Sequence, residues 1–156
     1  MILHVVGNRP QFIKMAPVLS AISRHDLDQK IVHTGQHYDA NMSEVFFRDL
    51  GLEPPSVQLH VGSGTHAEQT GRAMIELERV MQELCPDVVL VYGDTNTTLA
   101  TGLAAAKLKI PFGHVEGGPR TYDRGEPEEI NRLVADHLAK WNFCPDEISV
   151  ANLARE

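Results

Sequence analysis

Short apolar runs alternate with longer stretches of helical periodicity along the whole sequence, and this alternation strongly restricts the possible folds. The clearest run is Val88 to Tyr92, a nearly continuous β-branched segment typical of a strand buried on both faces. Other runs lie at 2–6, 30–34, 57–61 (a weak one), 112–115 and 141–144. Because the connections between strands and helices are short, the strands must run parallel with helices on both faces. The sequence therefore predicts an α/β fold with a doubly wound, Rossmann-like parallel sheet.

Capping and helix-breaking residues mark the ends of the helical stretches. Pro10 and Pro127 suit the first turn of a helix. Thr65 and Glu68 have the spacing of a capping box, and Pro86 stops the helix that follows. Helices are expected at about 10–22, 43–50, 66–84, 96–108, from 127 onward, and at 148–156.

Composition narrows the class of protein. The 156 residues contain no repeat or linker and predict one domain, 1–156. A net charge of −7 argues against a nucleic-acid partner, which requires a basic face. No apolar run approaches the roughly 20 residues of a membrane span. Cys85 and Cys144 are far apart and fit a reducing cytoplasm, and the histidines show no metal-binding spacing.

In doubly wound sheets, ligands bind beyond the carboxyl ends of the strands, so residues that follow strands are candidates for a site. Gly7 follows the first strand and permits a tight turn into a helix whose free amides can receive an anion. Arg9 and Lys14 add positive charge beside it. We expect this turn to bind a diphosphate; the alternative is a solvated surface turn.

Three carboxylates stand at successive strand or helix ends: Asp94, Glu116 and Glu128. Two of them have a structural alternative, since Asp94 can cap the next helix and Glu128 suits the positive end of a helix dipole. Glu116, by contrast, precedes two glycines that leave the backbone open to a ligand. Carboxylates that meet in one cleft can serve as general acids and bases.

One segment imitates a dinucleotide-binding motif. Residues 62–67 match G-x-G-x-x-A, but the weak strand before them is not the first of the fold, and the next acidic residue is too distant. We therefore expect no NAD cofactor, and the spacing of the histidines and cysteines predicts no metal. His4 and His114 lie within strand patterns and are expected in the core or behind the site.

The strand-end segments resemble the non-hydrolysing UDP-N-acetylglucosamine 2-epimerases. The matching blocks are GNRPQFIK at 7–14, GDTNTT at 93–98, HVEGG at 114–118 and PEEINR at 127–132. A further segment, HTGQHYDANMS at 33–43, is similar to relatives that act on the 2,3-diacetamido uronic acid form of the sugar.

This resemblance implies one half of a glycosyltransferase-B architecture, with the UDP-binding C-terminal domain absent from this chain. The implied reaction interconverts UDP-GlcNAc and UDP-ManNAc by elimination and re-addition of UDP, without a redox cofactor. Asp94, Glu116 and Glu128 match the family's active-site carboxylates, and Arg9 and Lys14 match its basic first loop. The implied protein is a cytoplasmic enzyme and a homodimer at full length, and the half alone is expected to be inactive.

The resemblance also concerns an effector and one altered loop. Gln36 and His37 match a pair that in some bacterial members contacts a second, allosteric UDP-GlcNAc. Where the family usually reads Glu-Ala-Gly-Leu-Arg, this chain reads EGGPR at 116–120. Two alternative functions stay open: a hydrolysing 2-epimerase that releases the free sugar, and a nucleotide-sugar binding module without turnover.

Overall fold

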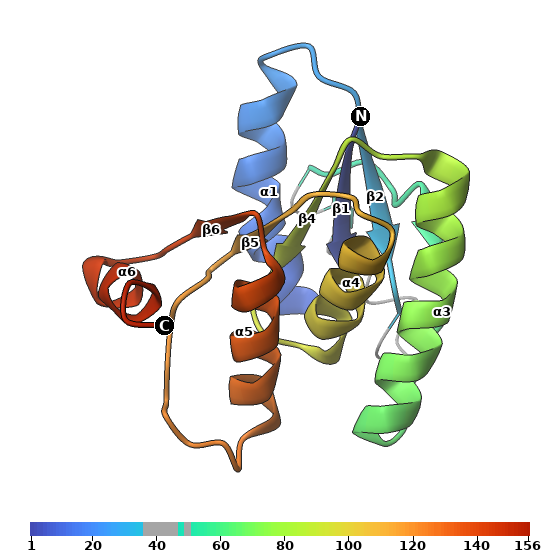
Figure 1. Ribbon diagram of the computed structural model, residues 1–156. Coiled ribbons are helices and arrows are strands. Elements are labelled where there is room, and N and C mark those ends of the chain that lie inside the picture. Colours follow the sequence, from blue (N-terminus) through green and yellow to red (C-terminus); the bar gives the residue numbers. More distant parts are fainter. Residues whose placement is uncertain (36–46, 49–50) are drawn as a thin grey trace.

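The computed structural model describes residues 1–35, 47–48 and 51–156. These residues form a six-stranded parallel sheet with helices on both faces (Figure 1). The strands are β1 Ile2–Val6, β2 Gln29–His33, β3 Val57–Gln58, β4 Val88–Tyr92, β5 Phe112–Val115 and β6 Trp141–Phe143. The helices are α1 Arg9–Ser23, α3 His66–Leu84, α4 Asn96–Lys107, α5 Pro127–Leu138 and α6 Glu147–Leu153. The predicted α/β fold is confirmed, and the bounds of the described helices and strands differ from the predicted ones by a few residues at most. The helix expected at 43–50 lies largely outside the described residues.

The strand order is β3-β2-β1-β4-β5-β6, so the chain builds the sheet outward in both directions from β1 and β4. β1 pairs in parallel with both β2 and β4. The direction of winding reverses between β1 and β4, and this switch point is where ligands bind in open α/β sheets. The carboxyl ends of β1, β4 and β5 therefore set the position of the site.

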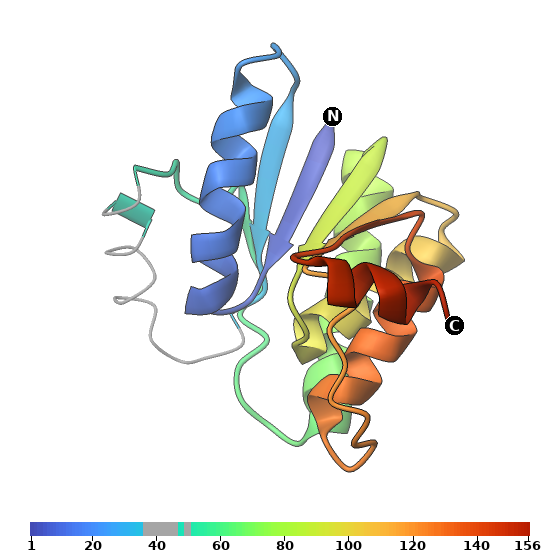
Figure 2. The same cartoon turned by 90° about the vertical axis from the view of Figure 1, so that its left-hand side faces the viewer.

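The helices form two layers around the sheet (Figure 2). α1 covers one face, where Phe12 and Met15 pack in a core with Val6 of β1. α3 and α4 cover the other face, where Leu77 packs in a second core with strand residues such as Val5. Because both faces are buried, the central strands are apolar at nearly every position, as their sequence indicates.

The predicted helix boundaries have the expected local chemistry. The Asn8 side chain accepts a hydrogen bond from the Gln11 amide at the start of α1. At α3 the capping box is present: Thr65 Oγ1 accepts from the Glu68 amide, and the Glu68 carboxylate accepts from the Thr65 amide at 2.9 Å. Over the described part of the chain, no helix combines the length and apolar character needed to cross a membrane.

Candidate active site

The turn after β1 is packed so tightly that only glycine fits. A Cβ atom on Gly7 would lie 2.3 Å from Thr97 Oγ1 and 2.6 Å from Thr34 Oγ1. These two hydroxyls also share a hydrogen bond of 2.8 Å. Gly7 therefore brings the backbone of the first turn directly against the start of α4 at the switch point.

A buried glutamine joins the carboxyl ends of β1 and β4. Gln11 Oε1 accepts from the Gly7 amide at 2.6 Å, and Gln11 Nε2 donates to the Tyr92 carbonyl at 2.6 Å. Gln11 Nε2 also reaches the hydroxyls of Thr95 and Thr98. The sequence analysis did not single out Gln11, although its position in the first turn of the helix after the first strand places it at the edge of the sheet where a site is expected. Gln11 fixes the two strand-end loops relative to each other.

Lys14 and Glu116 form an ion pair across the switch point. Lys14 comes from α1, and Glu116 directly follows β5, so two predicted residues far apart in sequence meet. The backbone of Gly93 lies beside both groups, because a Cβ there would be 3.1 Å from Lys14 Nζ and 3.3 Å from Glu116 Oε2. Both side chains are about one-third exposed and can exchange this contact for a ligand.

Glu116 adopts an unusual backbone conformation. Its φ angle is +76°, in the left-handed region that residues with a side chain rarely adopt. Such strain costs on the order of 1–3 kcal/mol and is concentrated at functional sites. The Glu116 amide donates to the carbonyl of Phe143 in β6 at 3.0 Å, which holds the strained residue in place.

Asp94 is engaged by α5 and does not cap α4. Its carboxylate accepts from Arg132 Nη1 at 2.5 Å, and its carbonyl accepts from Asn131 Nδ2 at 2.8 Å. The residue at the cap position of α4 is Thr95, which makes no side-chain capping bond. The capping alternative for Asp94 is therefore wrong. The Asp94 carboxylate is about one-third exposed, beside a buried guanidinium.

The two adjacent glutamates of α5 have different environments. Glu129 is 1% exposed and accepts from the amides of Thr121 and Tyr122 and from Arg132. Burial raises the pKa of the Glu129 carboxyl, but these donors outweigh it and bring the pKa below its usual value. Glu129 thus anchors the loop before α5, a role that sequence reasoning did not assign.

Glu128 lies on the exposed side of the first turn of α5. It precedes Asn131 by three residues and Arg132 by four, so it shares the helix face that contacts Asp94. Arg9 is exposed as the first residue of α1, at the same edge of the sheet. Gln36 and His37 lie outside the described residues.

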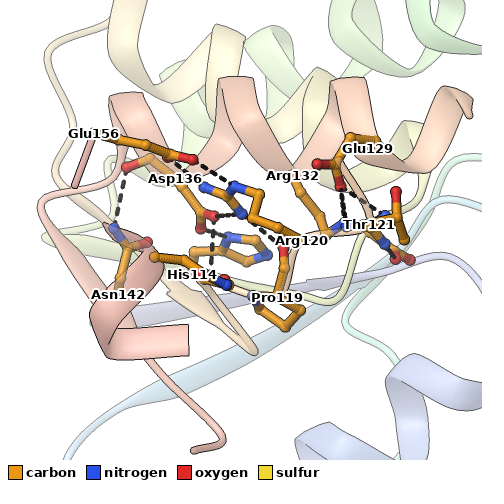
Figure 3. A network of polar contacts seen from close by, with 12 residues as sticks. His114, Pro119, Arg120, Thr121, Glu129, Arg132, Asp136, Asn142 and Glu156 are labelled. Carbon is orange, nitrogen blue, oxygen red and sulfur yellow. Dashed lines mark hydrogen bonds and ion pairs between the residues drawn. The ribbon is translucent and has the colours of Figure 1, made fainter. Parts of the chain in front are cut away.

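A network of polar contacts joins the end of β5 to α5 and to the end of the chain (Figure 3). His114 contacts Asp136 and the Gly93 carbonyl, and Asp136 in turn binds Arg120, which pairs with Glu156. Burial of His114 agrees with the sequence prediction. The charged groups linked to it were missed because they come from α5, the loop after β5 and the segment after α6.

Two other buried histidines, His4 and His33, are neutral. Burial lowers the pKa of His4 to about 4, against a smaller upward effect of Gln29. Burial likewise lowers the pKa of His33 to about 4. His4 accordingly accepts from the Tyr92 hydroxyl at Nδ1 and donates to Gln29 from Nε2. Neither residue belongs to the carboxylate cluster.

The segment that imitates a dinucleotide-binding motif, residues 62–67, lies at the outer edge of the sheet. β3 precedes it as a strand of two residues and is the outermost strand of the sheet, far from the switch point. Within the described ranges, no group of three or more histidine, cysteine, aspartate or glutamate side chains is arranged to hold a metal ion.

Comparison with known proteins gives the family. The model of the family described as UDP-N-acetylglucosamine 2-epimerase matches residues 20–156. The chain belongs to this family. A UDP-N-acetylglucosamine 2-epimerase of Methanocaldococcus jannaschii is 50% identical over 97% of this chain and 42% of that protein. A UDP-2,3-diacetamido-2,3-dideoxy-D-glucuronate 2-epimerase of Pseudomonas aeruginosa is 49% identical over 99% of this chain and 44% of that protein.

Solved structures of 2-epimerases share the fold. The Methanocaldococcus jannaschii UDP-GlcNAc 2-epimerase, in complex with UDP-GlcNAc and UDP, matches 99% of this chain with a TM-score of 0.95 and 49% identity. The Neisseria meningitidis enzyme bound to UDP-GlcNAc matches 99% with a TM-score of 0.92 and 37% identity. This chain covers 43% and 42% of those two chains, so it spans less than half of its 2-epimerase relatives.

Proposed function

We propose that this chain is the N-terminal domain of a nucleotide-sugar 2-epimerase that interconverts UDP-GlcNAc and UDP-ManNAc. The carboxylates of Asp94 and Glu116, each beside a cation at the switch point, are the observation that carries this proposal. The close relative named for UDP-2,3-diacetamido-2,3-dideoxy-D-glucuronate keeps that sugar as a second candidate substrate. The remaining chain of the full-length protein would form the second half of a glycosyltransferase-B architecture and hold UDP.

The proposed reaction has two stages: UDP is eliminated from the sugar and is then added back. A base removes the proton from C2 of the sugar, the C1–O bond breaks, and its electron pair leaves with UDP, giving a 2-acetamidoglucal. UDP then adds back to C1 while an acid protonates C2 from the opposite face. No net oxidation occurs, so the reaction requires no NAD.

The groups at the sheet edge suit this chemistry. Asp94, Glu116 and Glu128 would supply the acid and base groups that two-faced proton transfer requires. Lys14 and Arg9 would stabilise the negative charge that develops on the leaving diphosphate. In this scheme Lys14 leaves Glu116 for the diphosphate when substrate binds, which frees the carboxylate to accept a proton.

A product assay tests the proposal. The full-length protein is incubated with UDP-GlcNAc and, separately, with the 2,3-diacetamido uronic acid analogue, and the products are resolved by NMR. We expect the UDP-linked 2-epimer of one of them. Free N-acetylmannosamine with UDP would establish the hydrolysing alternative, and binding without any product would establish the binding module.

The isolated 156-residue chain should show no turnover. Half of the cleft leaves the sugar solvated and the diphosphate unheld, and catalysis depends on positioned groups acting together. Sustained formation of UDP-ManNAc by this chain alone would show that the second domain is dispensable.

We also propose that the full-length protein is a cytoplasmic homodimer without a nucleic-acid partner. The acidic net charge of −7 supports the lack of a nucleic-acid partner. The two free cysteines, Cys85 and Cys144, support a reducing, cytoplasmic environment. The dimer rests on the family resemblance. Light scattering of the full-length protein should give twice the monomer mass, and a monomer mass would refute the dimer.

A further inference from the structure

His114 is completely buried, and both of its ring nitrogens face acceptors. Nε2 lies 2.7 Å from the carbonyl oxygen of Gly93, and Nδ1 lies 2.6 Å from Oδ1 of Asp136. A carbonyl oxygen can only accept a hydrogen bond, so Nε2 must carry a proton. If Nδ1 is protonated as well, the ring is a positively charged imidazolium. The protonation state of Asp136 decides this question.

Asp136 is surrounded by donors that keep it ionised. Its Oδ2 accepts from Arg120 Nη1 at 2.7 Å and from the Gly118 amide at 3.0 Å. Burial raises the pKa of the Asp136 carboxyl, but the donors from His114, Arg120 and Gly118 outweigh it and bring the pKa below its usual value. Arg120 and the Gly118 amide bind Oδ2 independently of His114 and stabilise a negative carboxylate, so the geometry places the shared proton on Nδ1 and makes the buried ring an imidazolium paired with a carboxylate.

The two hydrogen bonds of His114 end at the two loops that carry the candidate catalytic carboxylates. The Gly93 carbonyl directly precedes Asp94 at the end of β4. Asp136 of α5 holds the amide of Gly118, two residues after Glu116. Asp136 has room there because residue 117 is glycine; a Cβ at that position would lie 2.8 Å from its Oδ1.

We propose that His114, as an imidazolium ion, is a positioning residue that holds Asp94 and Glu116 in the geometry required for proton transfer at the sugar. This inference rests on the proposed epimerase function and adds a residue that does not touch the substrate. It requires two hydrogen bonds from one side chain, so losing either one should displace one carboxylate relative to the other. A displacement of about 1 Å at a reacting group can cost roughly 10²-fold in rate.

The charged and dipolar groups that face the ring come from four elements: Asp136 on α5, Arg120 in the loop after β5, the Gly93 carbonyl after β4, and Glu156, which reaches the ring only through Arg120. His4 offers a matched control. It is equally buried on β1, which is separated from β5 by β4, but its partners include the Tyr92 hydroxyl, which can donate, so one ring nitrogen stays unprotonated.

The first test reads protonation directly and does not depend on activity. The full-length protein is labelled with ¹⁵N-histidine, and His114 and His4 signals are assigned from their loss in His114→Asn and His4→Asn variants. At pH 7.5 we expect both ring nitrogens of His114, and only one of His4, to carry protons. An unprotonated ring nitrogen in His114 would overturn the imidazolium.

The second test separates the two hydrogen bonds. His114→Asn places an amide donor near the former Nδ1 and keeps the bond to Asp136, whereas His114→Gln keeps the bond to Gly93. In the full-length protein each variant should lower kcat about 10²-fold with little change in KM, while His4→Gln should leave kcat unchanged. A folded His114→Gln protein with wild-type kcat would overturn the positioning role. A wild-type protein without epimerase activity would instead overturn the proposed function, and the nitrogen spectrum would still decide the charge of His114.

Discussion

Two arginines with the same local geometry should differ sharply in their effect on stability. Arg132 and Arg79 each pair with a glutamate three residues earlier on the same helix, both at 2.9 Å. The Arg132 side chain is 10% exposed and that of its partner Glu129 is 2% exposed, whereas the side chains of Arg79 and Glu76 are 70% and 41% exposed. Only the first pair would leave a buried charge without its counter-ion if the arginine were removed.

The expected magnitudes follow from this burial. Arg132→Met keeps the volume of the side-chain stem but removes the cation that Glu129 and Asp94 share, so it should cost about 3–5 kcal/mol in the free energy of unfolding. Arg79→Met removes an exposed pair in the same helical spacing and should cost less than about 0.5 kcal/mol. The exposed pair therefore controls for loss of charge and of helix propensity alone.

Urea unfolding of the full-length protein, followed by circular dichroism, measures both values. If Arg132→Met unfolds within about 0.5 kcal/mol of Arg79→Met, Glu129 does not depend on Arg132, and the account of the loop before α5 is refuted. A stable Arg132→Met protein would also allow the activity to be measured without the cation beside Asp94.

Two further predictions concern glycine positions and pH. Gly118→Ala should cost above about 3 kcal/mol, because φ is +93° and the new Cβ would meet the Ser149 carbonyl oxygen at 2.5 Å. Gly117→Ala would meet the side chains of Asp136 and Asn142 but no backbone atom and should cost about 1–2 kcal/mol; equal melting temperatures would contradict this. His4 and His33 have folded pKa values of about 4 against 6.5 in the unfolded chain, so the unfolded state binds more protons between those values. The contribution of these two histidines to the free energy of unfolding should therefore be fully present above pH 6.5 and fall by about 1.4 kcal/mol per pH unit for each histidine as pH drops toward 4. Urea midpoints that stay constant from pH 7 to 5 would refute the burial of neutral rings.

The fold was predictable because each level of the sequence agrees with the next. Continuous apolar runs such as Val88–Tyr92 allow burial on both faces, and short connections leave parallel strands as the only arrangement. The capping box of Thr65 and Glu68 is equally local, so its geometry follows from spacing alone. These features depend on residues close in sequence or on a repeated pattern.

The site was predictable only in part. Asp94 and Glu116 could be located because strand ends are recognisable and parallel strands end at one edge. The left-handed backbone of Glu116 leaves no sequence signal, because that conformation is normally taken by glycine, and the chain instead places glycines at 117 and 118. Neither the choice between Glu128 and Glu129 nor the contact of His114 with Asp136 follows from spacing, since helix phase relative to the sheet is set by tertiary packing.

Incorporation of solvent deuterium at C2 of the sugar measures removal of the C2 proton by the carboxylates at the sheet edge. Every turnover of the proposed reaction removes that proton, so full-length protein in deuterated water should label C2 in both UDP-linked epimers. Glu116→Gln, Asp94→Asn and Glu128→Gln preserve shape but remove ionisation, and each should lower labelling and kcat together by about 10²–10⁴-fold with little change in KM. A Glu116→Gln protein with wild-type kcat and full labelling at C2 would contradict the account, because Glu116 would then only order its loop.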